Sequence, residues 1–363
     1  MEVGLLQSMR SVIKEKLTLG YISFAEYMQM VLYHPKYGYY TTKNKVIGIE
    51  GDFYTSANVG TVFGETIAEK FVKEAVNKDL HNILEYAAGE GKIALAIINY
   101  LVQFYPQIYE KLTYYIIEIS PQMRDKQKLA LSPHMDKVKW IDNIAKIKPF
   151  KGLVFANELL DAMPVHVLKY FKGGLLELYI SLKGGKIHKA YLPCSNEVNN
   201  NAELIPELPT GSVLDFCTDA ITWLQEIYDN SSDVVIYIID YGYTIERKRS
   251  LQRRNRSTIR CFKNHKIYNN PLAEMGQRDI TADVDFTTLA KAAKSFGFNT
   301  CKLENQGKFI LQSGLYEKLV SNKAEFIQDK VLESKMHSLK QLVFPGAMGE
   351  AFEVLQLTKD FKK

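Results

Sequence analysis

The clearest pattern of apolar and polar positions in the chain lies between residues 83 and 101. An apolar run at Ile83 and Leu84 ends in Glu85 and gives way to a segment with two glycines, Gly89 and Gly91. Apolar residues then return at positions 93, 97, 98 and 101, which is the spacing of one helix face. The pattern predicts a strand, a tight glycine turn and a helix. Such a turn exposes bare backbone, so a nucleotide-like ligand can approach it closely.

Acidic residues at this turn narrow the choice of ligand. A lone Gly-x-Gly is weak evidence, because many such turns only connect a strand to a helix. Glu85 closes the strand, and Glu90 stands between the glycines. These carboxylates would repel a pyrophosphate, but they suit the sulfonium and ammonium groups of S-adenosylmethionine. Glu85, Ala87, Gly89 and Gly91 are therefore candidates for binding the methionine end of that cofactor.

Two later apolar runs also end in acids. The run at 114–118 ends in Glu118, which is suited to a ribose diol. The run at 137–141 is followed by Asp142 and Asn143, which could meet an adenine amino group. Three acid-tipped strands in this order favour a class I, Rossmann-like methyltransferase over a dehydrogenase.

The rest of the chain suggests three regions around that α/β core. For residues 1–80 we expect an extension of helices and loops that covers the active site. The core is expected at 81–165 and 233–363, with a mostly parallel seven-stranded sheet and a basic loop at 245–275, to which the family resemblance given below assigns the role of a lid. Between them, glycine pairs interrupt the apolar runs of 166–232, which predicts inserted antiparallel hairpins.

Some individual elements can also be predicted. Ser23 and Glu26 have the spacing of a capping box at the start of a helix. The unbroken apolar run at 234–239 predicts a strand buried on both faces. Towards the C-terminus we expect a strand at 309–312 and a final edge strand at 352–357.

Composition excludes several classes of protein. The chain has 363 residues, of which 46% are hydrophobic and 24% charged, as is ordinary for a soluble globular protein. Its net charge of +5 is too modest to indicate a nucleic-acid coat. The four cysteines are far apart and lack metal-ligand spacing, so we expect no metal and a reducing compartment. We also expect no membrane span, because no apolar run approaches the roughly 18 residues that one needs.

Candidate catalytic residues follow the apolar run at 153–156. Asn157, Glu158 and Asp161 come directly after it, and the spacing of the two acids would place them on one side of a helical turn. Carboxylates can orient a guanidinium and take its proton. The alternative is that Asn157 caps a helix and that the acids only favour the helix dipole. Asp52 is a further candidate, with a simple turn residue as its alternative.

Several longer motifs resemble the MidA family of S-adenosylmethionine-dependent methyltransferases. The resemblance extends from about Tyr33 to Leu355. It rests on these segments: Tyr33-x-x-x-x-Gly38-Tyr39-Tyr40, Gly51-Asp52-Phe53-Tyr54-Thr55-Ser56, Phe63-Gly64-Glu65, the loop 85–91, Asn157-Glu158-Leu159-Leu160-Asp161, Asp240-Tyr241-Gly242, Asp279-Ile280-Thr281-Ala282 and Gln306-Gly307-Lys308-Phe309.

The resemblance carries functional expectations. The family occurs in bacteria and mitochondria, and its mitochondrial member is a protein arginine methyltransferase that acts in respiratory complex I assembly. It implies S-adenosylmethionine as cofactor, a protein substrate such as a complex I subunit, and catalytic roles for Asn157, Glu158, Asp161 and Asp52. Asn157 would also contact the cofactor. The compartment would be the bacterial cytoplasm or, alternatively, the mitochondrial matrix, and a homodimer is consistent with this interpretation.

The chain departs from the family pattern at a few positions. Ala87 replaces the first glycine of the loop, and Ala57-Asn58 replaces the usual Pro-Glu. Asp283 stands where a histidine is customary, and Ser257 where glycine is common. These changes make a weakly catalytic, cofactor-binding assembly factor one alternative function.

The second alternative function rests on a basic segment. Residues 247–266 contain nine lysines or arginines and no acid. A solvated loop, a docking surface for an acidic partner and a nucleic-acid methyltransferase are all compatible with that charge. No RNA-binding signature accompanies it, so nucleic acid is the less favoured partner.

Overall fold

The computed structural model describes residues 8–42, 61–250, 255–321, 329–344 and 348–359. By spatial contact the chain forms two compact units. We call Tyr54–Leu159, Leu224–Gly242 and Ala293–Lys363 the core unit. Met1–Phe53, Leu160–Trp223 and Tyr243–Ala292 form the companion unit, which thus includes the basic segment predicted as a lid. The domain bounds and the lid expected from the sequence stay predictions.

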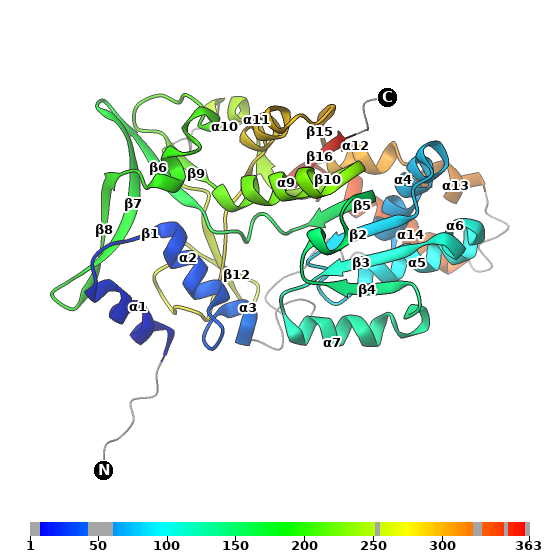
Figure 1. The fold of residues 1–363 in the computed structure, drawn as a ribbon, viewed down its shortest axis with the longest axis horizontal. Helices are drawn as coiled ribbons and strands as arrows, with labels where there is room; N and C mark the ends of the chain where they lie inside the picture. The colour runs from blue at the N-terminus through cyan, green and yellow to red at the C-terminus, as the bar shows by residue number, and fades with distance from the viewer. Residues whose placement is uncertain (1–7, 43–60, 251–254, 322–328, 345–347, 360–363) are drawn as a thin grey trace, which may run out of the picture. The chain divides into compact units, whose positions relative to one another are not determined.

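The core unit is built on a mostly parallel sheet (Figure 1). Its strand order is β15-β16-β10-β5-β2-β3-β4, in which β16 runs antiparallel to both of its neighbours. A short strand β14, whose residues belong to the companion unit's part of the chain, also pairs with β10, so among the described residues the sheet has eight strands and not the seven that we predicted. The strands are β2 (Asn82–Tyr86), β3 (Thr113–Ile117), β4 (Val138–Ile141), β5 (Phe150–Asn157), β10 (Ser231–Tyr243), β14 (Val284–Asp285), β15 (Thr300–Asn305) and β16 (Phe352–Lys359).

Helices connect these strands and bury the core between themselves and the sheet. The helices are α4 (Val62–Lys78), α5 (Lys92–Phe104), α6 (Pro106–Lys111), α7 (Pro121–Ala130), α9 (Thr218–Asn230), α11 (Phe286–Phe296), α12 (Gln306–Leu311), α13 (Leu315–Ser321), α14 (Asp329–Val343) and α15 (Met348–Ala351). The strand expected at 309–312 was wrong, because Asn305 caps α12 there by accepting the Lys308 N–H at 2.8 Å. The final strand, β16, exists, but it lies inside the sheet and not at its edge.

The Phe63-Gly64-Glu65 motif has a packing role in this unit. Phe63 is buried, and Gly64 lets α4 approach α5 so closely that an added Cβ would lie 2.6 Å from the Cβ of Ala96. Glu65, also buried, pairs with Lys335 of α14 at 2.8 Å. The motif therefore joins three helices of the core unit.

The companion unit is mainly antiparallel. One sheet has the order β1-β7-β6-β9 with β8 on β7, and a second has the order β12-β11-β13, so the hairpins predicted at the glycine pairs are present. Its elements are α1 (Met9–Thr18), β1 (Ile22–Ser23), α2 (Phe24–Tyr33), α3 (Tyr39–Thr42), β6 (His166–Phe171), β7 (Gly174–Lys183), β8 (Lys186–Pro193), α8 (Asn196–Asn199), β9 (Val213–Phe216), α10 (Ile245–Ser250), β11 (Arg260–Lys263), β12 (Lys266–Tyr268) and β13 (Asp279–Thr281).

One predicted feature of the companion unit can be checked directly. The capping box at the start of α2 is confirmed, since Ser23 Oγ accepts the Glu26 N–H at 3.1 Å and Glu26 Oε2 accepts the Ser23 N–H at 2.9 Å. A buried polar contact also joins β6 to β7, with His166 Nδ1 lying 2.6 Å from Glu177 Oε1. Among the described residues, no helix is long and apolar enough to cross a membrane.

Candidate functional site

Strand register in the core unit brings the predicted cofactor residues into one row. Tyr86 at the end of β2 pairs with Ile117 of β3 on one side and with Ala156 of β5 on the other. Ile117 in turn pairs with Ile141 of β4. The residues that follow these strand ends therefore lie side by side along the carboxyl edge of the sheet, in the order Asp142, Glu118, Ala87 and Asn157. Open α/β sheets bind their ligands at this edge.

The glycine turn between β2 and α5 has left-handed backbone at three alternate positions. The φ angles are +54° at Ala87, +53° at Gly89 and +79° at Gly91, directly before α5 begins. The Ala87 N–H donates to the Ile117 carbonyl at 2.9 Å, which fixes the turn to β3. Left-handed backbone costs a residue with a Cβ roughly 1–2 kcal/mol, so Ala87 adds strain where the family pattern has glycine.

Gln127 of α7 ties this turn to the carboxylate expected to bind ribose. Its fully buried amide donates from Nε2 to the Gly89 carbonyl at 2.9 Å and to Glu118 Oε2 at 3.1 Å. Its Oε1 accepts the Trp140 Nε1–H at 2.8 Å. Sequence reasoning missed Gln127. Met123 and Gln127 are four residues apart and both buried, so the inward face of α7 was the available signal.

Glu118 is buried beside this amide. Its Oε1 accepts the Ser120 N–H at 2.9 Å, and burial raises the pKa of its carboxyl group. Each carboxylate oxygen can accept two hydrogen bonds, so both oxygens keep capacity for a hydroxyl donor. The arrangement suits a ribose diol.

Glu85 is the most deeply buried acid at the turn. The Tyr114 hydroxyl donates to its Oε2 at 2.7 Å. Burial raises the pKa of Glu85 to about 8, against a smaller lowering by that hydrogen bond. The carboxyl group is therefore mostly neutral at pH 7 and would ionise more readily beside a cationic ligand.

Glu90 is held by two lysines. It pairs with Lys92 of α5 at 2.9 Å and with Lys126 of α7 at 3.0 Å. Burial alone would raise the pKa of Glu90, but the hydrogen bonds from these two lysines lower it overall. Glu90 thus keeps its negative charge at the start of α5, where Lys92 and Lys126 compensate it, so its charge alone does not select against a phosphate.

The pair predicted to meet adenine is more exposed. The Asp142 side chain is 63% exposed and pairs with Arg124 at 3.0 Å and with Lys146 at 2.6 Å. The hydrogen bond from Lys146 is the main reason that the pKa of Asp142 is lowered. Asn143 Oδ1 accepts the Ala145 N–H at 2.6 Å, so this side chain caps a short 3-10 helix. The adenine role of both residues stays a prediction.

The predicted catalytic motif begins at the end of β5. Asn157 Nδ2 donates to Glu158 Oε1 at 3.1 Å, and the Glu158 N–H donates to the Ile239 carbonyl of β10 at 2.9 Å. Glu158 has a left-handed φ of +53°, so the helical turn that we expected here does not form. Pro164 further disfavours a helix across the following residues. Asn157 therefore caps no helix, and Glu158 lies at the carboxyl edge of the sheet.

Asp161 belongs to the companion unit, because the chain passes from one unit to the other between Leu159 and Leu160. Its carbonyl accepts the Ala282 N–H at 2.9 Å, directly after β13. Asp52 lies outside the described residues. Among those that are described, no group of histidine, cysteine or acidic side chains has the arrangement of a metal site.

Tyrosines of the first family motif surround Asp161. The Tyr33 hydroxyl donates to the Ala162 carbonyl at 2.9 Å, and its ring stacks on that of Tyr40 at 5.4 Å between centroids. Burial raises the pKa of both tyrosines, and the charges of Asp279 and Asp161 raise it further. Two aromatic rings and two acids are thus gathered in one part of the companion unit.

Comparison with known proteins agrees with this geometry. Residues 62–303, more than half of the chain, match the profile of a family described as "Putative S-adenosyl-L-methionine-dependent methyltransferase". The chain belongs to this family. The expectation of a methyltransferase that uses S-adenosylmethionine is therefore confirmed.

Relatives of this methyltransferase are similar over most of its length. It is 27% identical to "Protein arginine methyltransferase NDUFAF7 homolog, mitochondrial" of Drosophila melanogaster, over 94% of this chain and 82% of that protein. It is 24% identical to "Protein arginine methyltransferase NDUFAF7, mitochondrial" of Danio rerio, over 92% and 82%. A crystal structure of a Burkholderia thailandensis protein bound to S-adenosyl-homocysteine superposes with a TM-score of 0.83 at 23% identity, covering 98% of this chain and 92% of that one. That likeness shows a shared fold.

At least four of the seven described cations in the basic segment 247–266 have partners within the companion unit. Lys248 is buried, with its Nζ 3.2 Å from the Tyr243 hydroxyl. Arg249 donates to the Glu207 carbonyl, Arg260 pairs with Asp283, and Lys263 pairs with Glu274. Cations that already have partners offer little to a nucleic acid.

Proposed function

We propose that this chain transfers a methyl group from S-adenosylmethionine to an arginine side chain of a protein. The observation that carries the proposal is the position of Glu158. It follows β5 directly, and β5 is the register neighbour of β2, whose glycine turn comes at the same edge of the sheet. Arginine is proposed as the acceptor because the relatives are named protein arginine methyltransferases.

The residues at this edge fit the cofactor. Gly91 has a φ of +79°, a left-handed backbone conformation that residues with a Cβ rarely adopt, so glycine suits this turn. Glu118 offers buried acceptors to a ribose diol. When bound, S-adenosylmethionine supplies an electrophilic methyl group on a sulfonium.

The remaining chemistry belongs to side chains of this protein. A guanidinium needs carboxylates that orient it through paired hydrogen bonds and accept the proton it releases. Glu158, held by the Asn157 amide, is proposed for this role. Asp161 is proposed as a second carboxylate, and the Tyr33 and Tyr40 rings beside it suit the flat face of a guanidinium.

Further parts of the proposal concern partners and compartment. A respiratory complex I subunit is the proposed substrate, since the family resemblance points to that system. The mitochondrial matrix is proposed on the names of the relatives, with the bacterial cytoplasm as the other compartment of the family. A homodimer remains a prediction.

Amide substitutions test the proposal. Glu158→Gln and Asp161→Asn keep shape but remove charge, and loss of an aligned general base typically slows a reaction ~10²–10⁴-fold. We expect normal S-adenosylhomocysteine affinity by calorimetry and transfer of labelled methyl to host-lysate protein at least about a hundredfold slower. Glu110→Gln on the exposed face of α6 is the matched control.

The outcomes separate the alternative functions. Full activity in both variants would refute the catalytic assignment. Label that disappears from the product after nuclease treatment would identify a nucleic-acid methyltransferase instead. A wild type that binds S-adenosylmethionine tightly and labels nothing in its host's lysate would favour the assembly factor.

A further inference from the structure

A large pocket in the companion unit is not used by the proposed reaction. It has a volume of about 1050 Å³ and is lined by α1, the turn after α2, the tip of the β7–β8 hairpin and the loop before β13. Ligand pockets for small molecules measure roughly 300–1,000 Å³, so this one is large enough for a polypeptide segment. We propose that it binds an acidic, partly apolar segment of the protein substrate.

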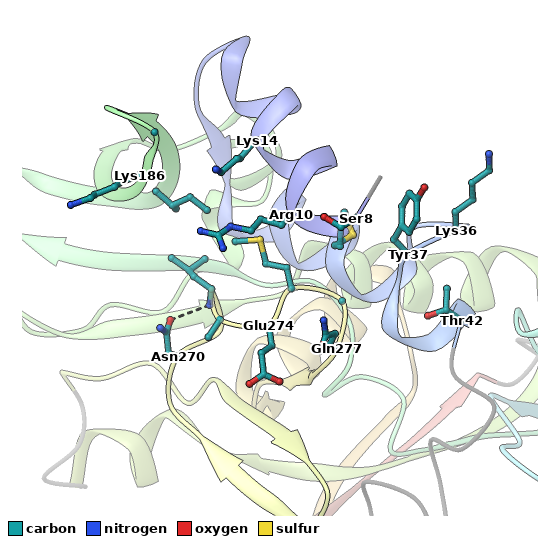
Figure 2. Close-up of a pocket in the computed structure, with 17 residues that line it drawn as sticks. Ser8, Arg10, Lys14, Lys36, Tyr37, Thr42, Lys186, Asn270, Glu274 and Gln277 are labelled. Atoms are coloured by element: carbon teal, nitrogen blue, oxygen red, sulfur yellow. Dashed lines mark hydrogen bonds between the residues drawn. The ribbon is translucent and has the colours of Figure 1, made fainter. Parts of the chain in front are cut away.

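The charge of the lining favours an anionic occupant. Arg10, Lys14, Lys36 and Lys186 all line the pocket, and within the described part of the chain none of the four forms an ion pair. Arg10 and Lys14 stand one turn apart on α1. Figure 2 shows them in the same part of the view as Lys186, with Lys36 on the other side. Figure 2 draws the ends of Lys36 and Lys186 pointing outward, so Arg10 and Lys14 are the cations best placed to attract the carboxylates of a ligand in the hollow.

The single acid in the lining does not cancel this charge. Glu274 pairs with Arg278 at 2.5 Å and also with Lys263. Hydrogen bonds from Lys263 and Arg278 lower the pKa of Glu274, so it stays ionised and compensated by its own partners. The four lining cations are therefore left for an external ligand.

Apolar lining residues favour a peptide over a nucleic acid. Met9, Ile187, Leu272 and Met275 contribute aliphatic and thioether surface, which adapts to side chains of different shape. Tyr37 is the aromatic ring of the lining, and one face of it is stacked on His34 at 5.3 Å between centroids. Single-stranded nucleic acids instead need several free aromatic faces along a basic track.

The inference rests on the proposed function only in naming the occupant as substrate. A segment bound here would hold the acceptor protein through residues remote from its arginine. Such binding raises the local concentration of the acceptor and lowers its KM, without altering the chemical step. Charge reversal in the pocket should therefore raise KM and leave kcat unchanged.

A direct binding experiment tests the pocket without any methylation. The probe is a fluorescein-labelled peptide of repeated Glu-Glu-Leu, with a Gln-Gln-Leu peptide and a labelled single-stranded DNA as comparisons. We expect anisotropy to show binding of the Glu peptide alone, weakened by added salt. Lys14→Glu and Arg10→Glu should each raise its Kd about tenfold or more. Lys16→Glu, on the same helix but outside the pocket lining, should change it by less than about twofold.

Several results would overturn the inference. One is equal peptide affinity in Lys14→Glu and Lys16→Glu, provided that both variants melt like the wild type. Another is a DNA probe that binds more tightly than the Glu peptide and loses its binding in Lys14→Glu. That result would assign the pocket to nucleic acid. If the Glu peptide binds as expected while no arginine is methylated in the lysate experiment, the pocket assignment stands and the proposed function fails. Unchanged KM for the protein acceptor in Lys14→Glu would refute the substrate role of the pocket.

Discussion

Replacing Gln127 with leucine should disturb stability and cofactor binding together. The side chain joins three groups that the chain brings from different elements: the Gly89 carbonyl, the Glu118 carboxylate and the Trp140 indole. Leucine fills a similar volume, so little cavity forms and the loss is confined to hydrogen bonds.

The size of the effect follows from the partners left behind. A buried polar group without a partner costs roughly 1–3 kcal/mol. Gly89 and Trp140 are half-buried, so water can replace part of what they lose, whereas Glu118 is buried. We therefore expect Gln127→Leu to lower the free energy of unfolding by about 2–4 kcal/mol. Affinity for S-adenosylhomocysteine should fall by about tenfold, because Glu118 and the turn lose their common support.

The assay can report on this network alone. The chain has two tryptophans, so a Trp223→Phe background leaves Trp140 as the fluorescent reporter during urea unfolding. Gln122→Leu is the matched control, since this half-buried residue of α7 bonds to the neighbouring Ser120 and should change stability by less than about 0.5 kcal/mol. Equal stability and equal affinity in the Gln127 and Gln122 variants would refute the reasoning.

Two further predictions concern buried positions of the core unit. Because burial raises the pKa of Glu85 from 4.5 to about 8, its contribution to stability is complete below pH 4.5 and is lost as pH rises through 8. The free energy of unfolding of the wild type, measured in urea relative to that of Glu85→Gln, should thus fall by on the order of 4 kcal/mol between pH 5 and pH 8. A difference between the two proteins that stays constant over this pH range would contradict the prediction. Gly64→Ala should destabilise by about 1–3 kcal/mol because its Cβ meets that of Ala96. The double variant Gly64→Ala/Ala96→Gly should recover much of that stability, because the second change removes the opposing Cβ. If the effects of the two single changes on the free energy of unfolding simply add, the contact between residues 64 and 96 is not the cause.

The sequence predicted the core elements well because their patterns are local. The run ending in Glu85, the glycine turn and the amphipathic helix after it depend on neighbouring residues alone, and all three elements are present. The row formed by Glu118, Ala87 and Asn157 also follows once the strands are parallel and in register. The functional roles of these residues stay predictions, because the strand register determines where they lie and does not show what they bind.

Other features depend on contacts between distant parts of the chain. The spacing of Glu158 and Asp161 predicts a helical turn, but the Glu158 N–H donates to the carbonyl of Ile239, which is 81 positions later in the sequence. Gln127 was not among the predicted site residues, because its three partners come from separate segments. Neither outcome can be read from local periodicity, since the competing interactions form only after the sheet has assembled.

The departures from the family pattern in the companion unit occur together around a single segment. Asp283, where a histidine is customary, pairs with Arg260, and its N–H donates to Thr258 Oγ1 at 2.9 Å. Ser257, where glycine is common, donates to Asp215 Oδ1 at 2.7 Å, and the same carboxylate also accepts the Thr258 N–H at 2.6 Å. The two unusual residues therefore bind the basic segment to β9 and to the residues after β13. Their hydrogen bonds hold a segment whose positive charges would otherwise repel one another, which gives both substitutions a structural reason independent of catalysis.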